Sequence, residues 1–252
     1  MEKLFDLNEK GCSIRCRLYA PDRARQLPQL VLYGHGFGGH KDNRAAARFA
    51  DYLLAKRHDA GLVCFDWPCH GGDGRKKLLL EDCSLYLELL VRALPGLFAS
   101  EALYGYATSF GAYLFLKYAA EHGSPFRRMA LRCPAVPMAD VLEKNIMGEE
   151  ERRLLARGKD ALVGFDRKIR ISPEFLAAVR AADLRGMDFS SCRDELLLLH
   201  GTKDEIVPFE AVERFAEEQR LLLLPVEKAD HRFQDPLLMG EAVREIYDFF
   251  WG

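Results

Sequence analysis

The sequence lacks an excess of charge of either sign. Its 36 lysines and arginines nearly balance 38 aspartates and glutamates, which leaves a net charge of −2 over 252 residues. A protein that binds nucleic acid or an acidic membrane surface through its overall charge carries a basic excess. The longest basic cluster, Arg75–Lys77, is too short to supply one. We therefore expect neither nucleic acid nor a membrane among the partners.

Long apolar runs are also missing. No uninterrupted apolar stretch approaches the length that crosses a bilayer, and no basic-then-apolar leader opens the sequence. Internal repeats and low-complexity tracts are absent as well. We expect a soluble, cytoplasmic protein.

Paired cysteines are lacking too. The seven cysteines are odd in number and scattered, without the paired spacing of a zinc site. Cys12 and Cys16 alternate with Ile14 and Leu18, as on one face of a strand. Buried free thiols in a reducing compartment explain this usage, and we expect no metal.

What is present is an alternation of short apolar runs with amphipathic helical patterns. Leu30–Tyr33 and Gly61–Phe65 are continuous apolar runs, which are typical of strands buried on both faces. Further strands are predicted at Lys3–Leu7, Ser13–Tyr19, Ala102–Ala107, Met129–Cys133, Leu196–Leu199 and Leu221–Leu224. Helices are predicted at Arg44–Arg57, Asp82–Leu97, Phe110–His122, Pro208–Glu218 and Leu237–Phe250. The pattern predicts an α/β protein with a mainly parallel, twisted sheet and helices on both faces.

One segment interrupts this alternation. Between Pro134 and Ser191 we find no convincing strand, only helical stretches such as Glu149–Ala156 and Pro173–Ala182. So long a connection is unusual in a compact domain unless it has a function. We interpret residues 135–190 as a helical cap insertion over the carboxyl edge of the sheet, with residues 1–134 and 191–252 forming the core. A peripheral helical hairpin, distant from any site, is the alternative.

Ser109 lies at the junction of a predicted strand and a predicted helix. A strand that turns directly into a helix forces the corner residue into a strained conformation and needs small residues two positions before and after it. Ala107 and Gly111 meet that need. The hydroxyl would then be held at the carboxyl edge of the sheet. On this stretch alone, a helix N-cap is an equally good interpretation of Ser109.

Other predicted strands also end in polar residues, and these should meet Ser109 at one edge of the sheet. Asp204 follows Leu196–Leu199, and His231 follows Leu221–Leu224. Serine needs a base to remove its proton, and the base needs a carboxylate that fixes its tautomer. The order Ser109, Asp204, His231 suits this architecture and predicts a nucleophile–acid–base set.

Other polar residues near these strand ends are weaker candidates for the catalytic roles. Asp230 is adjacent to His231, so its side chain should point away from the imidazole, and either Asp204 or Glu205 is surplus. His200 and His35 precede glycines at strand ends, where packing or loop hydrogen bonds are expected. We assign Asp66 and His70 to loop scaffolding and Cys69 to a buried position.

The motifs at these positions resemble those of the α/β-hydrolase superfamily, along essentially the whole chain. They are the glycine-rich loop His35–Gly39, the elbow Ala107–Gly111, the acid loop Gly201–Pro208 and the histidine loop Ala229–Phe233. Within the superfamily they look most like bacterial cinnamoyl/feruloyl esterases and serine-aminopeptidase-like (S33) hydrolases, which carry a helical insertion at this place. Ala107 in place of the elbow glycine and Cys69 in place of a loop glycine are departures, and the second leaves the subfamily open.

The resemblance implies a serine carboxylesterase-type hydrolase (EC 3.1.1-like) that cleaves esters of small or aromatic acyl groups. Ser109, His231 and Asp204 would form its catalytic triad, and the backbone N–H groups of Phe37 and Phe110 its oxyanion hole. No metal or organic cofactor is implied. The expected partner is a small-molecule ester substrate, and a homodimer stays open. Thioesterase and aminopeptidase-like activities on the same triad are the alternatives.

Two other classes compete. Gly34, Gly36 and Gly39 lie between a strand and a helix and fit the spacing of an NAD(P)-binding fingerprint. That interpretation does not explain Ser109, Asp204 and His231. A non-catalytic binding module on the same scaffold would usually lack a member of the triad, whereas this sequence has all three.

Overall fold

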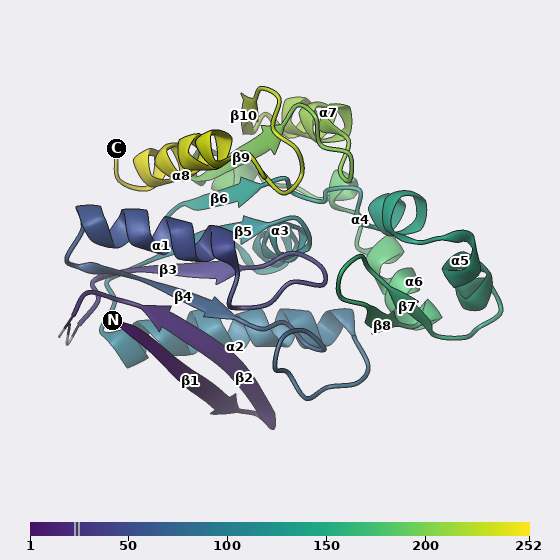
Figure 1. The fold of residues 1–252 in the computed structure, drawn as a ribbon, viewed down its shortest axis with the longest axis horizontal. Coiled ribbons are helices and arrows are strands. Elements are labelled where there is room, and N and C mark those ends of the chain that lie inside the picture. Colours follow the sequence, from purple (N-terminus) through teal and green to yellow (C-terminus); the bar gives the residue numbers. More distant parts are fainter. Residues whose placement is uncertain (23, 25) are drawn as a thin grey trace.

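The computed structural model describes residues 1–22, 24 and 26–252. Within these residues, eight strands form one mixed sheet in the order β1-β2-β4-β3-β5-β6-β9-β10 (Figure 1). The strands are β1 (Glu2–Glu9), β2 (Cys12–Tyr19), β3 (Gln29–Gly34), β4 (Ala60–Phe65), β5 (Ala102–Thr108), β6 (Met129–Arg132), β9 (Leu196–Gly201) and β10 (Leu222–Val226). Strand β2 is antiparallel to both of its neighbours, β1 and β4. The remaining strands, β4, β3, β5, β6, β9 and β10, run parallel to one another. The predicted mainly parallel sheet is confirmed.

Helices cover both faces of this sheet, as predicted (Figure 1). They are α1 (Arg44–Lys56), α2 (Leu80–Phe98), α3 (Phe110–His122), α7 (Phe209–Gln219) and α8 (Pro236–Trp251). Strand β3 shows why its run is apolar throughout: Leu30 and Leu32 pack into the core beneath α2 and α3, whereas Val31 and Tyr33 pack into the core beneath α1 and α8. Successive side chains of a strand point to opposite faces, so a strand between two helical layers needs apolar residues at every position.

The segment of residues 135–190, called the insertion below, lies beside the carboxyl ends of the parallel strands (Figure 1). It contains α4 (Met138–Asp140), the π-helical η1 (Val141–Ile146), α5 (Glu149–Ala156), β7 (Ala161–Val163), β8 (Ile169–Ile171), α6 (Pro173–Ala181) and the 3₁₀ segment η2 (Leu184–Gly186), and the 3₁₀ segment η3 (Ser190–Glu195) leads out of it. The predicted helices α5 and α6 are present.

The expectation that this segment has no strand is wrong, because β7 and β8 pair as an antiparallel hairpin. Each of these strands is three residues long, with buried outer residues and an exposed central one. Such short alternation is too weak a signal to separate a strand from a loop.

None of the helices in the described part of the chain is long and apolar enough to cross a membrane. The seven cysteines are all free; six of them are buried and Cys69 is half-buried.

Candidate active site

Ser109 is the single residue between β5 and α3, and its backbone is strained. Its φ is 52° and its ψ is −115°, a conformation that an L-residue adopts only at a cost of about 1–3 kcal/mol. The helix can start so abruptly because Gly111 has no side chain: a Cβ there would lie 2.5 Å from the carbonyl oxygen of Gly34. Serine at such a corner presents its hydroxyl beyond the edge of the sheet, and it makes no capping hydrogen bond to α3.

Three side chains from different loops are joined by hydrogen bonds at this corner. His231 Nε2 lies 3.1 Å from Ser109 Oγ, and His231 Nδ1 lies 2.7 Å from Asp204 Oδ2. An ionised carboxylate can only accept, so Nδ1 carries the proton and Nε2 is left to accept from the serine hydroxyl. The structure thus brings together all three residues of the set predicted from chain order.

Asp204 is held as an anion by several donors. Its Oδ1 accepts from the backbone N–H groups of Ile206 and Val207 at 2.9 and 2.7 Å. Burial by itself raises its pKa, but hydrogen bonds from His200 and His231 outweigh that effect and hold the pKa well below the ordinary value of 3.8. A carboxylate fixed in this way can orient the imidazole and stabilise an imidazolium.

The rival carboxylates do not contact the imidazole ring. Glu205 Oε2 lies 3.5 Å from the backbone N–H of His231, and Asp230 Oδ1 accepts from the backbone N–H of Gln234 at 3.0 Å. Both serve the loop backbone, and Asp204 alone of the three lies within hydrogen-bonding distance of the ring in the part of the chain that the structure describes.

The glycine-rich loop after β3 passes directly over the serine. A Cβ on Gly36 would lie 3.3 Å from the Cβ of Ser109. The amides of Phe37 and Phe110, predicted to form an oxyanion hole, donate to no backbone carbonyl among the described residues. Their rings pack edge to face with centroids 5.6 Å apart. These amides are therefore free to donate to a developing oxyanion, as the prediction requires.

Asp66 supports this loop, as predicted. Its buried carboxylate accepts from the backbone N–H of Lys41 at 2.6 Å and from that of Gly72 at 2.8 Å. It therefore joins the loop after β3 to the loop after β4. The same loop argues against the dinucleotide fingerprint, because α1 begins only at Arg44 and Gly39 does not open the helix.

His35 and His70 are buried beneath the loop as uncharged imidazoles. His35 Nε2 accepts from the backbone N–H of Trp67 at 3.3 Å, so Nδ1 carries the proton that it donates to the carbonyl of Gly36 at 2.8 Å. Burial, with a further contribution from His70, puts the pKa of His35 well below 6.5. Burial lowers the pKa of His70 to about 4, although its bond to the Pro68 carbonyl opposes this shift. Both are scaffolding, as predicted.

His70 should make the protein sensitive to acid. Between about pH 6.5 and pH 4 the unfolded chain takes up a proton at His70 that the folded protein refuses, so the free energy of unfolding falls as the pH decreases. A pKa lowered to about 4 corresponds to about 3 kcal/mol. We expect urea unfolding at pH 7 and pH 4 to show a drop larger by about this amount in the wild type than in His70→Gln. Equal drops in the two proteins would contradict the assignment.

The sequence predicted packing or a loop hydrogen bond for His200, and the structure shows both, but its place behind the Asp204 carboxylate was not predicted. His200 Nε2 donates to the carbonyl of Val207 at 2.9 Å and lies 3.2 Å from Asp204 Oδ2, behind the carboxylate. Cys133, His200 and Asp204 have donor atoms within 4.8 Å of one another, a grouping that could hold a metal. Burial and then Asp204 raise the pKa of the Cys133 thiol well above 9. Because the carboxylate and His200 are already engaged in hydrogen bonds, the cluster is better explained as support for Asp204.

A cavity of about 820 Å³ opens onto Ser109 and His231. The insertion contributes Ile146, Phe165 and Arg167 to its lining. Arg167 is anchored by a hydrogen bond from Nη2 to the carbonyl of Gly71 at 2.7 Å. Cys69 does not line this cavity and is half-buried rather than buried, contrary to expectation. Residues 135–190 thus border the same space as the serine.

No protein-family model matches the chain. Solved structures with a similar backbone include Est1E from Butyrivibrio proteoclasticus with bound ferulic acid, at 17% identity and a TM-score of 0.78, covering 98% of this chain and 100% of that one. Alpha/beta hydrolase domain-containing protein 10 from mouse matches at 16% identity and a TM-score of 0.75, covering 98% of each chain. An a/b serine hydrolase without lid from Xanthomonas campestris matches at 16% and 0.64, covering 97% and 94%.

These alignments span nearly the full length of each chain, so the likeness concerns the whole architecture and not a shared motif. Identities of this size show the fold alone. The fold predicted from the sequence motifs is confirmed: the chain has the α/β-hydrolase fold.

Proposed function

We propose that the protein is a serine hydrolase that cleaves carboxylic esters of small or aromatic acyl groups through an acyl-enzyme. The observation that carries this proposal is the continuous line of hydrogen bonds from Asp204 through His231 to Ser109, with the serine in a strained corner beside two unengaged amides. A merely structural serine would not need a base, an orienting carboxylate and free N–H donors together.

The chemistry follows from the tautomer that Asp204 imposes. His231 Nε2 takes the proton of Ser109 as Oγ attacks the ester carbonyl, and the carbonyl oxygen becomes an oxyanion. Collapse of this intermediate expels the alcohol, which receives the proton from His231, and leaves an acyl-serine. Water, activated by His231, then attacks the acyl group, and the acid is released as Ser109 recovers its proton.

The amides of Phe37 and Phe110 would stabilise the oxyanion that forms when Ser109 attacks the ester and the one that forms when water attacks the acyl-serine. Loss of one donor of this kind typically costs about 10²–10³ in rate. Asp66 contributes indirectly, since it holds the loop that carries Phe37 through the backbone N–H of Lys41.

The cavity lining favours an acyl group of modest size with apolar character. Phe37, Ile146, Phe165 and Ile206 supply apolar surface next to Ser109, and such walls bind flat or short acyl chains by burial of apolar area. The relative Est1E was solved with ferulic acid, an aromatic acid. This likeness supports an aromatic acyl group in the substrate.

A substrate panel tests this function. We expect turnover of nitrophenyl acetate, butyrate and cinnamate, with a higher kcat/KM than for matched thioesters and aminoacyl nitroanilides, which is the order that defines an esterase. A higher kcat/KM for the thioesters or the anilides would replace the esterase assignment with that alternative. No turnover of any member by folded protein would refute it.

A further inference from the structure

The cavity that holds Ser109 is unusually rich in arginine. Five arginines line it, two from the first turns of α1, one from the end of β6, one from the insertion and one from the histidine loop: Arg44, Arg48, Arg132, Arg167 and Arg232. The single carboxylate in the lining is Asp166, which pairs with Arg232 at 3.0 Å. Because the whole chain carries a net charge of only −2, this positive charge is local to the cavity.

Most of this charge is uncompensated. Within the ranges that the structure describes, no carboxylate lies at ion-pair distance from Arg44, Arg48, Arg132 or Arg167. Elsewhere in the described chain arginines are divided: Arg57 pairs with Asp59 and Arg185 with Asp183, whereas Arg127 and Arg244 have no carboxylate at ion-pair distance. What distinguishes this cavity is therefore the number of arginines that line it. Arg44 and Arg48 are exposed, and their guanidinium groups are free to meet an anion.

Arg132 is the most informative of the five. It is only 5% exposed, and its guanidinium interacts with the buried phenol of Tyr106. Its Nη1 donates to the carbonyl of Arg232 at 3.3 Å, and its guanidinium lies 4.8 Å from the ring centroid of Phe233. A buried guanidinium that lacks a carboxylate is costly and is normally paired. Because Arg132 lines the cavity of Ser109, an anion bound in that cavity would supply the negative charge that the guanidinium lacks.

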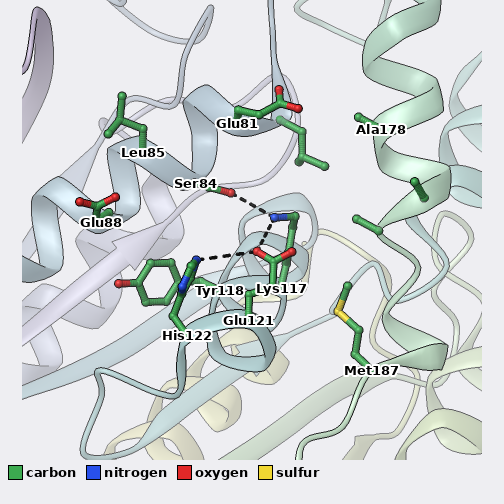
Figure 2. Close-up of a pocket in the computed structure, with 13 residues that line it drawn as sticks. Glu81, Ser84, Leu85, Glu88, Lys117, Tyr118, Glu121, His122, Ala178 and Met187 are labelled. Atoms are coloured by element: carbon green, nitrogen blue, oxygen red, sulfur yellow. Dashed lines mark hydrogen bonds and ion pairs between the residues drawn. The ribbon is translucent and has the colours of Figure 1, made fainter.

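A second cavity shows that arginines do not gather at every hollow of this protein. It lies between α2, α3 and α6 (Figure 2), and Glu81, Glu88 and Glu121 line it together with Lys117. Lys117 is paired there with Glu121 at 2.6 Å and donates to Ser84 at 3.2 Å (Figure 2). This cavity is acidic and its cation is compensated, the opposite of the cavity at Ser109.

We propose that the natural substrate is an ester that carries a negatively charged group, a carboxylate or a phosphate, which the arginines of this cavity bind while Ser109 attacks the ester carbonyl. This inference rests on the proposed hydrolase function and narrows its substrate class. Guanidinium groups bind both anions through paired N–H donors in one plane. Arg44 and Arg48 lie four residues apart, so they extend from the same face of α1, whose N-terminus adds partial positive charge.

Matched pairs of esters test the proposal and separate the two anions. The carboxylate arm compares mono-(4-nitrophenyl) glutarate with 4-nitrophenyl pentanoate, and the phosphate arm compares 4-acetoxyphenyl phosphate with 4-methoxyphenyl acetate. We expect the charged ester of at least one pair to have a kcat/KM about 10-fold higher or more, since hydrogen bonds to charged groups contribute effects of this order. Raising the ionic strength to about 0.5 M should reduce this ratio, because exposed charges are screened.

The variants Arg44→Gln plus Arg48→Gln should lower the ratio of charged to neutral ester by about 10-fold. Arg132→Lys, which keeps a charge but loses the planar donor set, should lower it as well. Arg214→Gln, an exposed change on α7 that does not line the cavity, should leave both rates unchanged.

Equal kcat/KM for charged and neutral esters, with turnover that still depends on Ser109, would overturn the anion inference and leave the hydrolase proposal intact. No Ser109-dependent turnover of any of these esters would overturn both.

Discussion

Replacing Ser109 with alanine is expected to lower kcat for nitrophenyl esters by at least about 10⁴-fold. The serine oxygen is the atom that forms the acyl bond in the proposed mechanism, and no other hydroxyl lies within hydrogen-bonding distance of His231 Nε2 among the described residues. The residual rate would come from binding and from the amides of Phe37 and Phe110, which the variant retains. Steady-state kinetics on nitrophenyl butyrate measures the loss.

This variant should fold. Ser109 makes no capping hydrogen bond to α3, so alanine removes a hydroxyl without leaving a backbone group unsatisfied, and the thermal midpoint should stay within a few degrees. Ser84→Ala is a matched control, because Ser84 lies in the acidic cavity away from the triad (Figure 2) and should keep full turnover. Wild-type rates in Ser109→Ala would refute the nucleophile assignment.

The second large effect is expected for Asp204→Asn, about 10³–10⁴-fold in kcat. The asparagine oxygen can still accept from the backbone N–H groups of Ile206 and Val207, so the loop should stay folded. Its NH₂ group would then face His231 Nδ1, which must become an acceptor. The proton moves to Nε2, and the imidazole can no longer receive the proton of Ser109.

Two neighbouring carboxylates provide the controls for this variant. Glu205→Gln and Asp230→Asn alter groups that contact only loop backbone, and each should change kcat by less than about tenfold. The same kinetic assay checks all three variants. If either control is more damaging than Asp204→Asn, the acid of the triad has been assigned to the wrong residue.

Much of the fold could be predicted from sequence because burial imposes its pattern on each element. A strand between two helical layers must be apolar at successive positions, as β3 and β4 are, and α3 begins at Phe110 and ends before Gly123, a residue with a φ of 82°. The hairpin β7–β8 escaped prediction because three residues per strand carry too little periodicity.

The same contrast holds for the site. Ser109, Asp204 and His231 could be predicted because each follows a strand and the parallel strands end at one edge. The place of Arg132 could not be predicted, because it depends on the order of the strands in space. Strand β6 lies between β5 and β9, and the register pairs Thr108 with Arg132 and Arg132 with Leu199. That order brings Arg132 beneath the histidine loop and beside Ser109. The spacing of these residues along the sequence does not predict this contact.

Labelling with a fluorophosphonate measures the central claim most directly, because the probe reacts only with a serine that a base has activated. Intact mass and peptide sequencing should show one adduct, located on Ser109. It should be missing in Ser109→Ala and should form much more slowly in His231→Ala and Asp204→Asn. An adduct on another residue, or no adduct on protein that is folded by its circular dichroism spectrum, would contradict the account.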